Sequence, residues 1–240
     1  YGSAANANNA FITKPGYPIA SFYGYKYIGV FQSEEELAKY PHLSGDKVGD
    51  GRYEDVNKDG VLDQNDKTIL GDNNPLFTAG FSNSFSYKNF TLDIQFTGSY
   101  RAEVFSFYKR MCGIYHGDRN GMIEQLGRWQ SKDQPGDGIH FRPTRTPSGW
   151  QRDPSSAWVQ DASYLRLRNL TLGYNFDQKV LDKMKMKGLR LYVTGQNLFT
   201  ITNYVGYDPE TSSESGLAQG GDYLGYPAAR SFIIGANITF

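Results

Sequence analysis

The chain has 240 residues, of which 39% are hydrophobic and 21% charged, and its 25 basic and 25 acidic residues balance to a net charge of zero. Its mean hydropathy of −0.56 excludes a helical membrane protein, which needs roughly 20 consecutive apolar residues for each span. The missing basic excess argues against a nucleic-acid-binding protein. Aromatic residues reach 15%, which argues against disorder. The one cysteine, Cys112, says little about the compartment.

Apolar and polar side chains alternate along several segments, and a period of two is typical of strands with one apolar and one wet face. Six strands are predicted, near residues 21–31, 77–87, 90–101, 163–174, 189–201 and 231–240. The alternation changes phase within the fourth predicted strand, because Leu165 and Leu167 fall on the face opposite to Leu170 and Leu172. A bulge near Arg168, or a strand end that projects beyond the apolar layer, would explain this change.

The connections between the predicted strands alternate in length. A tight turn at residues 87–89 and a modest connection at 176–188 separate three long connections, at about 32–75, 102–162 and 202–230. Strands of roughly ten residues, with short turns at one end and long loops at the other, are typical of outer-membrane barrels. A soluble β-sandwich with one wet face predicts the same alternation, but it explains such long loops less well.

The number of strands suggests that the chain is a part of something larger. Six strands cannot close a wide barrel, since eight already enclose only their own side chains. The chain also starts at Tyr1 rather than at methionine, either because a leader was removed or because it is a piece of a longer protein. The strand count favours the second explanation, so we expect the C-terminal part of a larger barrel.

Residues 55–66 fit the calcium-loop template at positions one, three, five and six. Calcium takes six to eight hard oxygen ligands. Gly60 permits the sharp turn, but the twelfth position holds an aspartate, one methylene shorter than the usual glutamate. No amphipathic helix leads into the segment, so we expect an isolated calcium loop that pins a long surface loop; the alternative is a polar turn without metal. The expected ligands are Asp55, Asn57, Asp59, the carbonyl of Val61, Asp63 and Asp66.

Two further groups of residues are candidates for contacts with a substrate or a partner. Arg166 and Arg168 lie in a predicted strand, where the alternative is an ion pair across the wall or at the rim. Aromatic residues of the later long loops suit stacking on sugar rings or peptide side chains, and the alternative is packing among the loops. These aromatic candidates are Trp129, Trp150, Tyr207, Tyr223 and Tyr226. No G-x-S-x-G, H-E-x-x-H or P-loop motif is present, so no catalytic residues and no enzyme activity are predicted.

Several stretches, taken together and in order, resemble the SusC/RagA family of TonB-dependent outer-membrane transporters. The resemblance covers almost the whole chain from residue 17 to residue 240, whereas residues 1–16 match nothing that we can place. The stretches are SFYGYKYIGVF at 21–31, GRYEDVNKDGVLDQNDKTILG at 51–71, residues 77–100, SYLRLRNLTLGY at 163–174, LRLYVTGQNLF at 189–199, YDPE at 207–210, Tyr226-Pro227 and the last strand, which ends at Phe240.

The resemblance implies an all-β chain that forms the C-terminal antiparallel strands of a transmembrane barrel of about 22 strands with long extracellular loops. It implies import of oligosaccharides or peptides across the outer membrane of a Gram-negative, Bacteroidota-like bacterium. It also implies a SusD-like surface lipoprotein as a lid, and energy from TonB through an N-terminal region that these residues lack. The alternative is a soluble, calcium-dependent, β-rich carbohydrate-binding module.

Overall fold

A computed structural model of the chain describes residues 10–113, 120–143, 154–211 and 216–240. The chain divides into two compact units. The first, called the loop unit, comprises residues 1–74, 103–160 and 211–225. The second, called the strand unit, comprises residues 75–102, 161–210 and 226–240. Within the described residues, no helix is both long enough and apolar enough to span a membrane.

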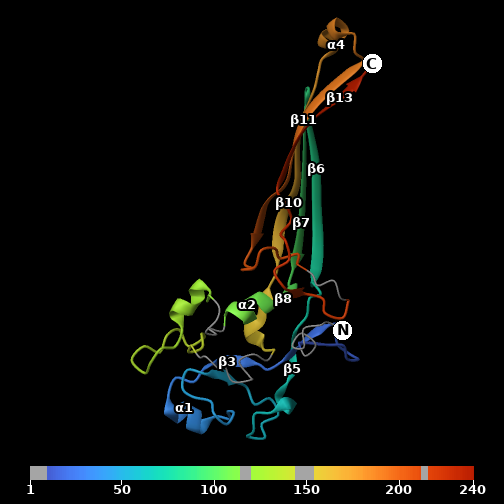
Figure 1. Ribbon diagram of the computed structural model, residues 1–240. Helices are drawn as coiled ribbons and strands as arrows, with labels where there is room; N and C mark the ends of the chain where they lie inside the picture. Colours follow the sequence, from blue (N-terminus) through green and yellow to red (C-terminus); the bar gives the residue numbers. More distant parts are fainter. Residues whose placement is uncertain (1–9, 114–119, 144–153, 212–215) are drawn as a thin grey trace. The chain divides into compact units, whose positions relative to one another are not determined.

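The strand unit is one antiparallel sheet of five long strands, which run side by side in Figure 1. In spatial order the strands are β13, β11, β10, β7 and β6, so neighbours along the chain are neighbours in the sheet. Their bounds lie within one residue of the alternating segments in the sequence. They are β6 (Phe77–Tyr87), β7 (Phe90–Tyr100), β10 (Tyr164–Asn175), β11 (Gly188–Thr202) and β13 (Ser231–Thr239).

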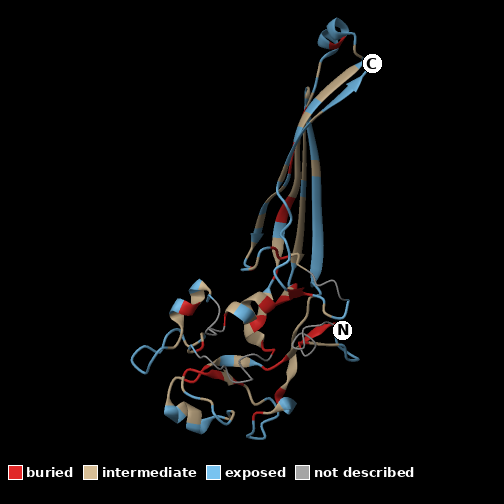
Figure 2. Cartoon of the chain, in the orientation of Figure 1, coloured by how far each residue is buried: buried red, intermediate tan, exposed pale blue. Residues whose placement is uncertain are grey.

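The register gathers apolar side chains on one face of this sheet. One row takes a single residue from each strand, in the order Phe85, Leu92, Leu172, Val193 and Ile234. Phe85 is 54% exposed and Ile234 is 84% exposed, so no second layer of the described chain covers this face. Figure 2 accordingly shows the long strands mostly as exposed or intermediate. Among the described residues, the sheet is therefore a single layer.

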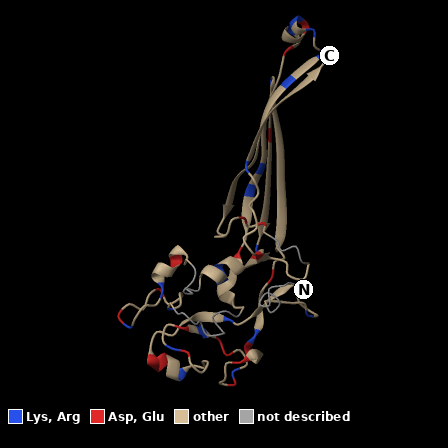
Figure 3. Cartoon of the chain, viewed as in Figure 1, with Lys and Arg blue, Asp and Glu red and all other residues tan. Residues whose placement is uncertain are grey.

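The opposite face is polar. A row near the middle of the sheet reads Ser82, Gln95, Asn169, Gln196 and Ser231, again one residue from each strand. Charged residues are sparse along the strands in Figure 3. The alternation of the sequence thus becomes two faces of opposite character, because successive side chains of a strand point to opposite sides.

The phase change in β10 is a β-bulge at Arg168. Leu167 pairs with Phe96 and Asn169 pairs with Gln95, so Arg168 is an extra residue of β10 against β7. The extra residue brings the apolar side chains before and after it onto the same face.

Two short connections join the strands at one end of the sheet. Lys88 and Asn89 link β6 to β7, and Lys88 adopts a left-handed backbone with φ of 51°. The link between β10 and β11 contains helix α4 (Gln178–Met184), which Figure 1 places beside the ends of β11 and β13. The two long connections, from β7 to β10 and from β11 to β13, join the strands at the other end, where the segment before β6 also enters the sheet, since Phe77 pairs with Tyr100 and Tyr164 pairs with Thr202.

The loop unit has short elements only. Three small sheets run in the orders β1–β2–β5, β12–β8–β9 and β3–β4. Helix α1 (Glu34–Lys39) is capped by Ser33, whose side chain accepts a hydrogen bond from the Glu36 amide. The strands are β1 (Phe11–Ile12), β2 (Ser21–Gly24), β3 (Tyr27–Val30), β4 (Gly51–Tyr53), β5 (Thr68–Gly71), β8 (Glu103–Ser106), β9 (Val159–Asp161) and β12 (Gly221–Asp222). The other helices are η1 (Gln64–Asp66), α2 (Phe107–Cys112), η2 (Ile123–Gly127) and η3 (Ser156–Trp158).

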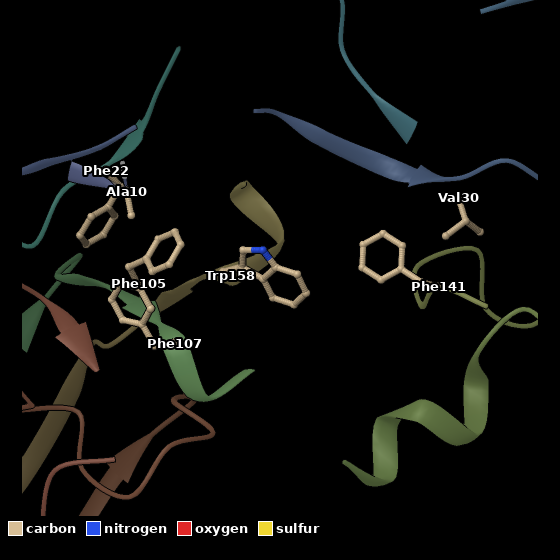
Figure 4. Close-up of a cluster of buried hydrophobic side chains, with 7 residues drawn as sticks. All are labelled: Ala10, Phe22, Val30, Phe105, Phe107, Phe141 and Trp158. Atoms are coloured by element: carbon tan, nitrogen blue, oxygen red, sulfur yellow. The ribbon is translucent and has the colours of Figure 1, made fainter. Parts of the chain in front are cut away.

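The loop unit has its own aromatic core. Figure 4 shows Trp158 between a group of phenylalanines on one side and Phe141 with Val30 on the other. The ring centroids of Trp158 and Phe141 lie 6.2 Å apart. Each fully buried side chain of this size contributes roughly 1.5–3 kcal/mol to the stability of the fold. The long connections therefore pack together into one folded unit. The core residues are Ala10, Phe22, Val30, Phe105, Phe107, Phe141 and Trp158.

The prediction of one long strand at residues 21–31 is wrong. The segment forms β2 and β3, and neither pairs with the five-stranded sheet. β2 pairs with β1 and β5, whereas β3 pairs with β4. Phe22 and Tyr25, which an extended strand would direct to opposite sides, are both fully buried inside the loop unit. Burial from several sides, rather than one apolar face, explains the weaker alternation of this segment.

Candidate functional site

A buried ion cluster holds the segment that follows β11 against the polar face of the sheet. Arg166, on β10, is 3% exposed. Its Nη2 atom donates to Asp208 Oδ1 at 2.6 Å, and its Nη1 atom donates to Glu210. Its Nε atom donates to Thr200 Oγ1 at 2.8 Å. Each of the three nitrogens of the planar guanidinium therefore donates a hydrogen bond, which fixes the segment at residues 207–210 over the polar face.

Glu210 is shared between two arginines. Arg168, at the bulge, donates through Nη2 to Glu210 and through Nε to Thr97 Oγ1 at 2.9 Å. Tyr164 donates its hydroxyl to Glu210 at 2.5 Å. The bulge thus has a clear structural effect, because it directs Arg168 toward the same carboxylate that Arg166 binds. Two cations and two anions compensate one another, so the cluster carries no net charge.

Asp208 also binds a second segment, which contains Ala228. Its Oδ2 atom accepts a hydrogen bond from the Ala228 amide at 2.9 Å, and its Oδ1 atom accepts one from the Glu210 amide at 3.0 Å. Burial acts to raise the pKa of Asp208, but the bonds from Arg166 and the two amides outweigh it and hold the pKa below its ordinary value. The resulting stabilisation is present above the unfolded-state pKa of about 4 and is lost as the pH falls through the lower folded-state value.

The arginine candidates are therefore ion-pair residues in this structure. Arg166 is too deeply buried for direct contact with a substrate, whereas the Arg168 side chain is 31% exposed. In the sequence, residues 207–210 stand out only as a point of resemblance, and the roles of Asp208 and Glu210 were not predicted. Two carboxylates two residues apart, beside two arginines with the same spacing in a strand, are the signal that could have revealed them.

The aromatic candidates separate into exposed and packed residues. In the strand unit, Tyr207 is 68% exposed and Tyr226 is fully exposed. In the loop unit, Tyr223 stacks on Phe107 with the ring centroids 4.0 Å apart. Trp129 is half-buried and packs against the aromatic core. Trp150 lies outside the described residues.

The calcium-type loop adopts a tight turn in which carboxylates accept bonds from backbone amides. The two Asp55 oxygens accept from Lys58 at 2.6 Å and from Gly60 at 2.9 Å. Asp66 is fully buried and accepts from Val56 at 2.9 Å and from the Asp63 amide at 2.8 Å. Gly60 has a φ of 83°, as the sharp turn requires.

The same loop does not show a converged metal cage. Among the described residues, no three or more histidine, cysteine, aspartate or glutamate side chains come together as metal ligands would. A carboxylate oxygen that accepts a hydrogen bond from a backbone amide keeps a second lone pair. The side-chain oxygens of the expected ligands can therefore still coordinate calcium. These ligands are Asp55, Asn57, Asp59, Asp63 and Asp66. The calcium site stays a prediction.

One apolar and one polar face, with long connections at one end of the sheet and short ones at the other, are features typical of outer-membrane barrels. No protein-family model matches the chain. The chain is 35% identical over 236 residues to TonB-dependent receptor P3 of Formosa agariphila, which covers 95% of this chain and 23% of that receptor. It is 27% identical over 231 residues to TonB-dependent receptor SusC of Bacteroides thetaiotaomicron, covering 95% of this chain and 20% of SusC.

Solved structures share the fold. The RagAB peptide transporter matches with a TM-score of 0.75 at 22% identity, over 97% of this chain and 24% of that chain. The open-open state of the RagAB peptide importer matches with a TM-score of 0.74. The chain is related over almost its whole length to TonB-dependent receptors, SusC among them. It spans about a quarter of the length of the curated relatives that it matches, with a coverage of 23% of the first.

Proposed function

We propose that the strand unit is part of the wall of a transmembrane barrel of about 22 strands, at its C-terminal end. The whole receptor would import oligosaccharides or peptides across the outer membrane with energy from TonB, as a transporter and not as an enzyme. The open edges of the sheet support this proposal. β6 and β13 each have a neighbour on one side only among the described strands, and unpaired edges of this length normally require a partner strand.

The observation that carries the proposal is the uncovered apolar face and the aromatic residues at its two ends. Phe77 pairs with Tyr100 at the loop end, and Tyr87, Phe90 and Tyr174 form a row at the turn end. The ten steps between the 11 residues from Phe90 to Tyr100 rise about 33 Å along the strand. At a tilt of about 40° this length projects to about 25 Å, the height of the apolar band of outer-membrane barrels.

The sidedness follows from the connections. The end of the sheet that carries the long segments would face the outside of the cell, and the end with the turn at Lys88 and Asn89 would face the periplasm. The polar face would then line the lumen. The segment at residues 207–210, held there by Arg166, would narrow the lumen near its outer mouth.

A SusD-like surface lipoprotein is the partner that we propose for the outer mouth. Tyr207 and Tyr226 are strongly exposed on segments that the ion cluster fixes. Rigid, exposed tyrosines are favourable contact residues in protein interfaces, and they also stack on cargo. TonB would act through a region outside these residues, and membrane lipid would cover the apolar face.

Purification of the full-length receptor from its native outer membrane tests this function. We expect a surface lipoprotein to co-purify in mild detergent, and cells that lack the receptor to lose uptake of either labelled oligosaccharides or labelled peptides. Uptake of both cargo classes at the normal rate without the receptor would overturn the import function. Recovery of a lone barrel in every detergent tried would overturn the partner.

The soluble carbohydrate-binding module is not favoured. A secreted module would need a second layer over residues such as Phe85 and Ile234, which are 54% and 84% exposed. Monomeric soluble proteins rarely expose a contiguous apolar face of this kind.

We also propose that residues 55–66 bind calcium with a structural role. The tight turn at Gly60 supports a template loop, and the carboxylates offer hard oxygen ligands. In the full-length receptor, we expect the variant with Asp55→Asn and Asp59→Asn to lose about tenfold or more in calcium affinity, measured by isothermal titration. The variant with Asp46→Asn and Asp133→Asn, which removes equal charge elsewhere in the loop unit, should keep its affinity. No calcium binding by the unaltered receptor would contradict the proposal.

A further inference from the structure

Five exposed lysines gather at the turn end of the strand unit, on the two short connections. The same connections contain two carboxylates, and both accept local hydrogen bonds. Asp177 Oδ1 accepts from Asn89 Nδ2 at 2.8 Å, and Asp182 Oδ1 accepts from Gln178 Nε2 at 2.8 Å. In the part of the chain that the structure describes, no carboxylate lies within ion-pair distance of these lysines. The lysine cluster comprises Lys88, Lys179, Lys183, Lys185 and Lys187.

The lysines are held together by the end of the sheet. The Asn175 amide donates to the Asn89 carbonyl at 2.8 Å, which joins the two short connections. The Lys187 amide donates to the Thr239 carbonyl at 2.8 Å, which joins α4 and its C-terminal extension to β13. Leu181 is buried and anchors the helix. The positive charges therefore occupy a defined surface.

Helix α4 has the character of a helix at a membrane surface. Val180 and Met184 lie one turn apart and are 39% and 47% exposed. Lys179 and Lys183 form the adjacent stripe with the same spacing. An exposed apolar stripe beside a lysine stripe is typical of interfacial helices, which place the apolar side chains below the headgroups and the lysines among them.

One member of the cluster, Lys88, lies at the level of the aromatic row. Lys88 Nζ is 5.4 Å from the centre of the Tyr87 ring, and Tyr87 pairs with Phe90. Aromatic rows of this kind mark the boundary between the apolar band and the headgroups. A cation beside such a row is placed at the depth of lipid phosphates, and Lys side chains readily extend toward that layer.

We propose that the lysine cluster is a binding surface for anionic phospholipid headgroups of the periplasmic leaflet. This inference rests on the proposed membrane-spanning function. Five ammonium groups against two carboxylates, both already hydrogen-bonded, complement a lipid with a net negative charge such as phosphatidylglycerol. The zwitterionic phosphatidylethanolamine offers no net charge and would be bound less well.

The experiment measures which lipids remain on the purified full-length receptor. The receptor is equilibrated with equal amounts of phosphatidylglycerol and phosphatidylethanolamine, stripped of loosely bound lipid and examined by native mass spectrometry. We expect about fivefold enrichment of phosphatidylglycerol. The enrichment should fall to near one when all five lysines are replaced by glutamine. A control with Lys14, Lys39, Lys47, Lys58 and Lys132 replaced by glutamine loses the same charge from the loop unit and should keep the enrichment.

The outcomes separate this inference from the function on which it rests. Heat-modifiable migration in electrophoresis first establishes that each variant forms a barrel. A barrel without preference for phosphatidylglycerol, or equal losses in the cluster variant and the control, overturns the lipid surface alone. A preference for lipid A in a parallel mixture, without one for phosphatidylglycerol, also overturns it. A receptor that forms no barrel overturns both the function and the inference.

Discussion

Replacing Ile94 with arginine is expected to destabilise the full-length receptor by about 2–4 kcal/mol. Ile94 lies near the middle of β7, on the apolar face, in register with Asn83 and Leu170. If that face meets lipid, the arginine would place a charge close to the bilayer midplane, where no water solvates it. Urea unfolding of the receptor in lipid vesicles measures the change in the free energy of unfolding.

The neighbouring residue supplies the matched control. Gln95 lies at almost the same depth but on the polar face, in register with Ser82 and Asn169. Gln95→Arg would direct the same charge into the water-filled lumen and should lower the free energy of unfolding by well under half as much. Equal tolerance of the two substitutions would rule out lipid contact on the apolar face.

Arg166→Met is the second change with a large expected effect, a loss of about 3–5 kcal/mol in the stability of the segment at residues 207–210. The methionine keeps most of the apolar volume but removes the guanidinium that pairs with Asp208 and Glu210. Asp208 would then be a buried carboxylate without its cation. Hydrogen exchange of the full-length receptor should show fast exchange of the Glu210 and Ala228 amides, while the middle of β7 stays protected.

Arg168→Met is the control for the cluster. The Arg168 side chain is 31% exposed, and Glu210 would keep its bonds from Arg166 and Tyr164. The loss should therefore be about 1 kcal/mol or less. Equally fast exchange in both variants would mean that the buried arginine does not hold the segment.

The five strands of the sheet could be predicted from the sequence because each has one apolar and one polar face. Alternation with a period of two records this directly, and the row from Phe85 to Ile234 is the result. The bulge at Arg168 was also visible in the sequence, because one extra residue shifts the phase of the alternation. For residues 21–31 the same pattern wrongly predicted one long strand of the sheet. Tyr25 and Phe22 are instead buried in a core that no local pattern describes.

The candidate site was only partly predictable. The two arginines were visible in the sequence as ion-pair candidates, but their partners Asp208 and Glu210 lie about 40 residues away in the chain. Contacts of this separation depend on the register of β10 with β11 and on the bulge, which a single sequence does not determine. Aromatic residues posed the same problem, because Trp129 and Tyr207 look alike in sequence, yet Trp129 packs inward and Tyr207 is 68% exposed.

Cysteine accessibility along β7 in the full-length receptor tests the membrane-spanning sheet most directly. Single cysteines replace Leu92, Asp93, Ile94, Gln95 and Phe96 in turn, in a background with Cys112→Ser, and intact cells are treated with a small water-soluble maleimide. We expect labelling that alternates, with the Asp93 and Gln95 positions reactive through the lumen and the Leu92, Ile94 and Phe96 positions protected by lipid. Labelling of all five positions, or of the apolar positions alone, would contradict it.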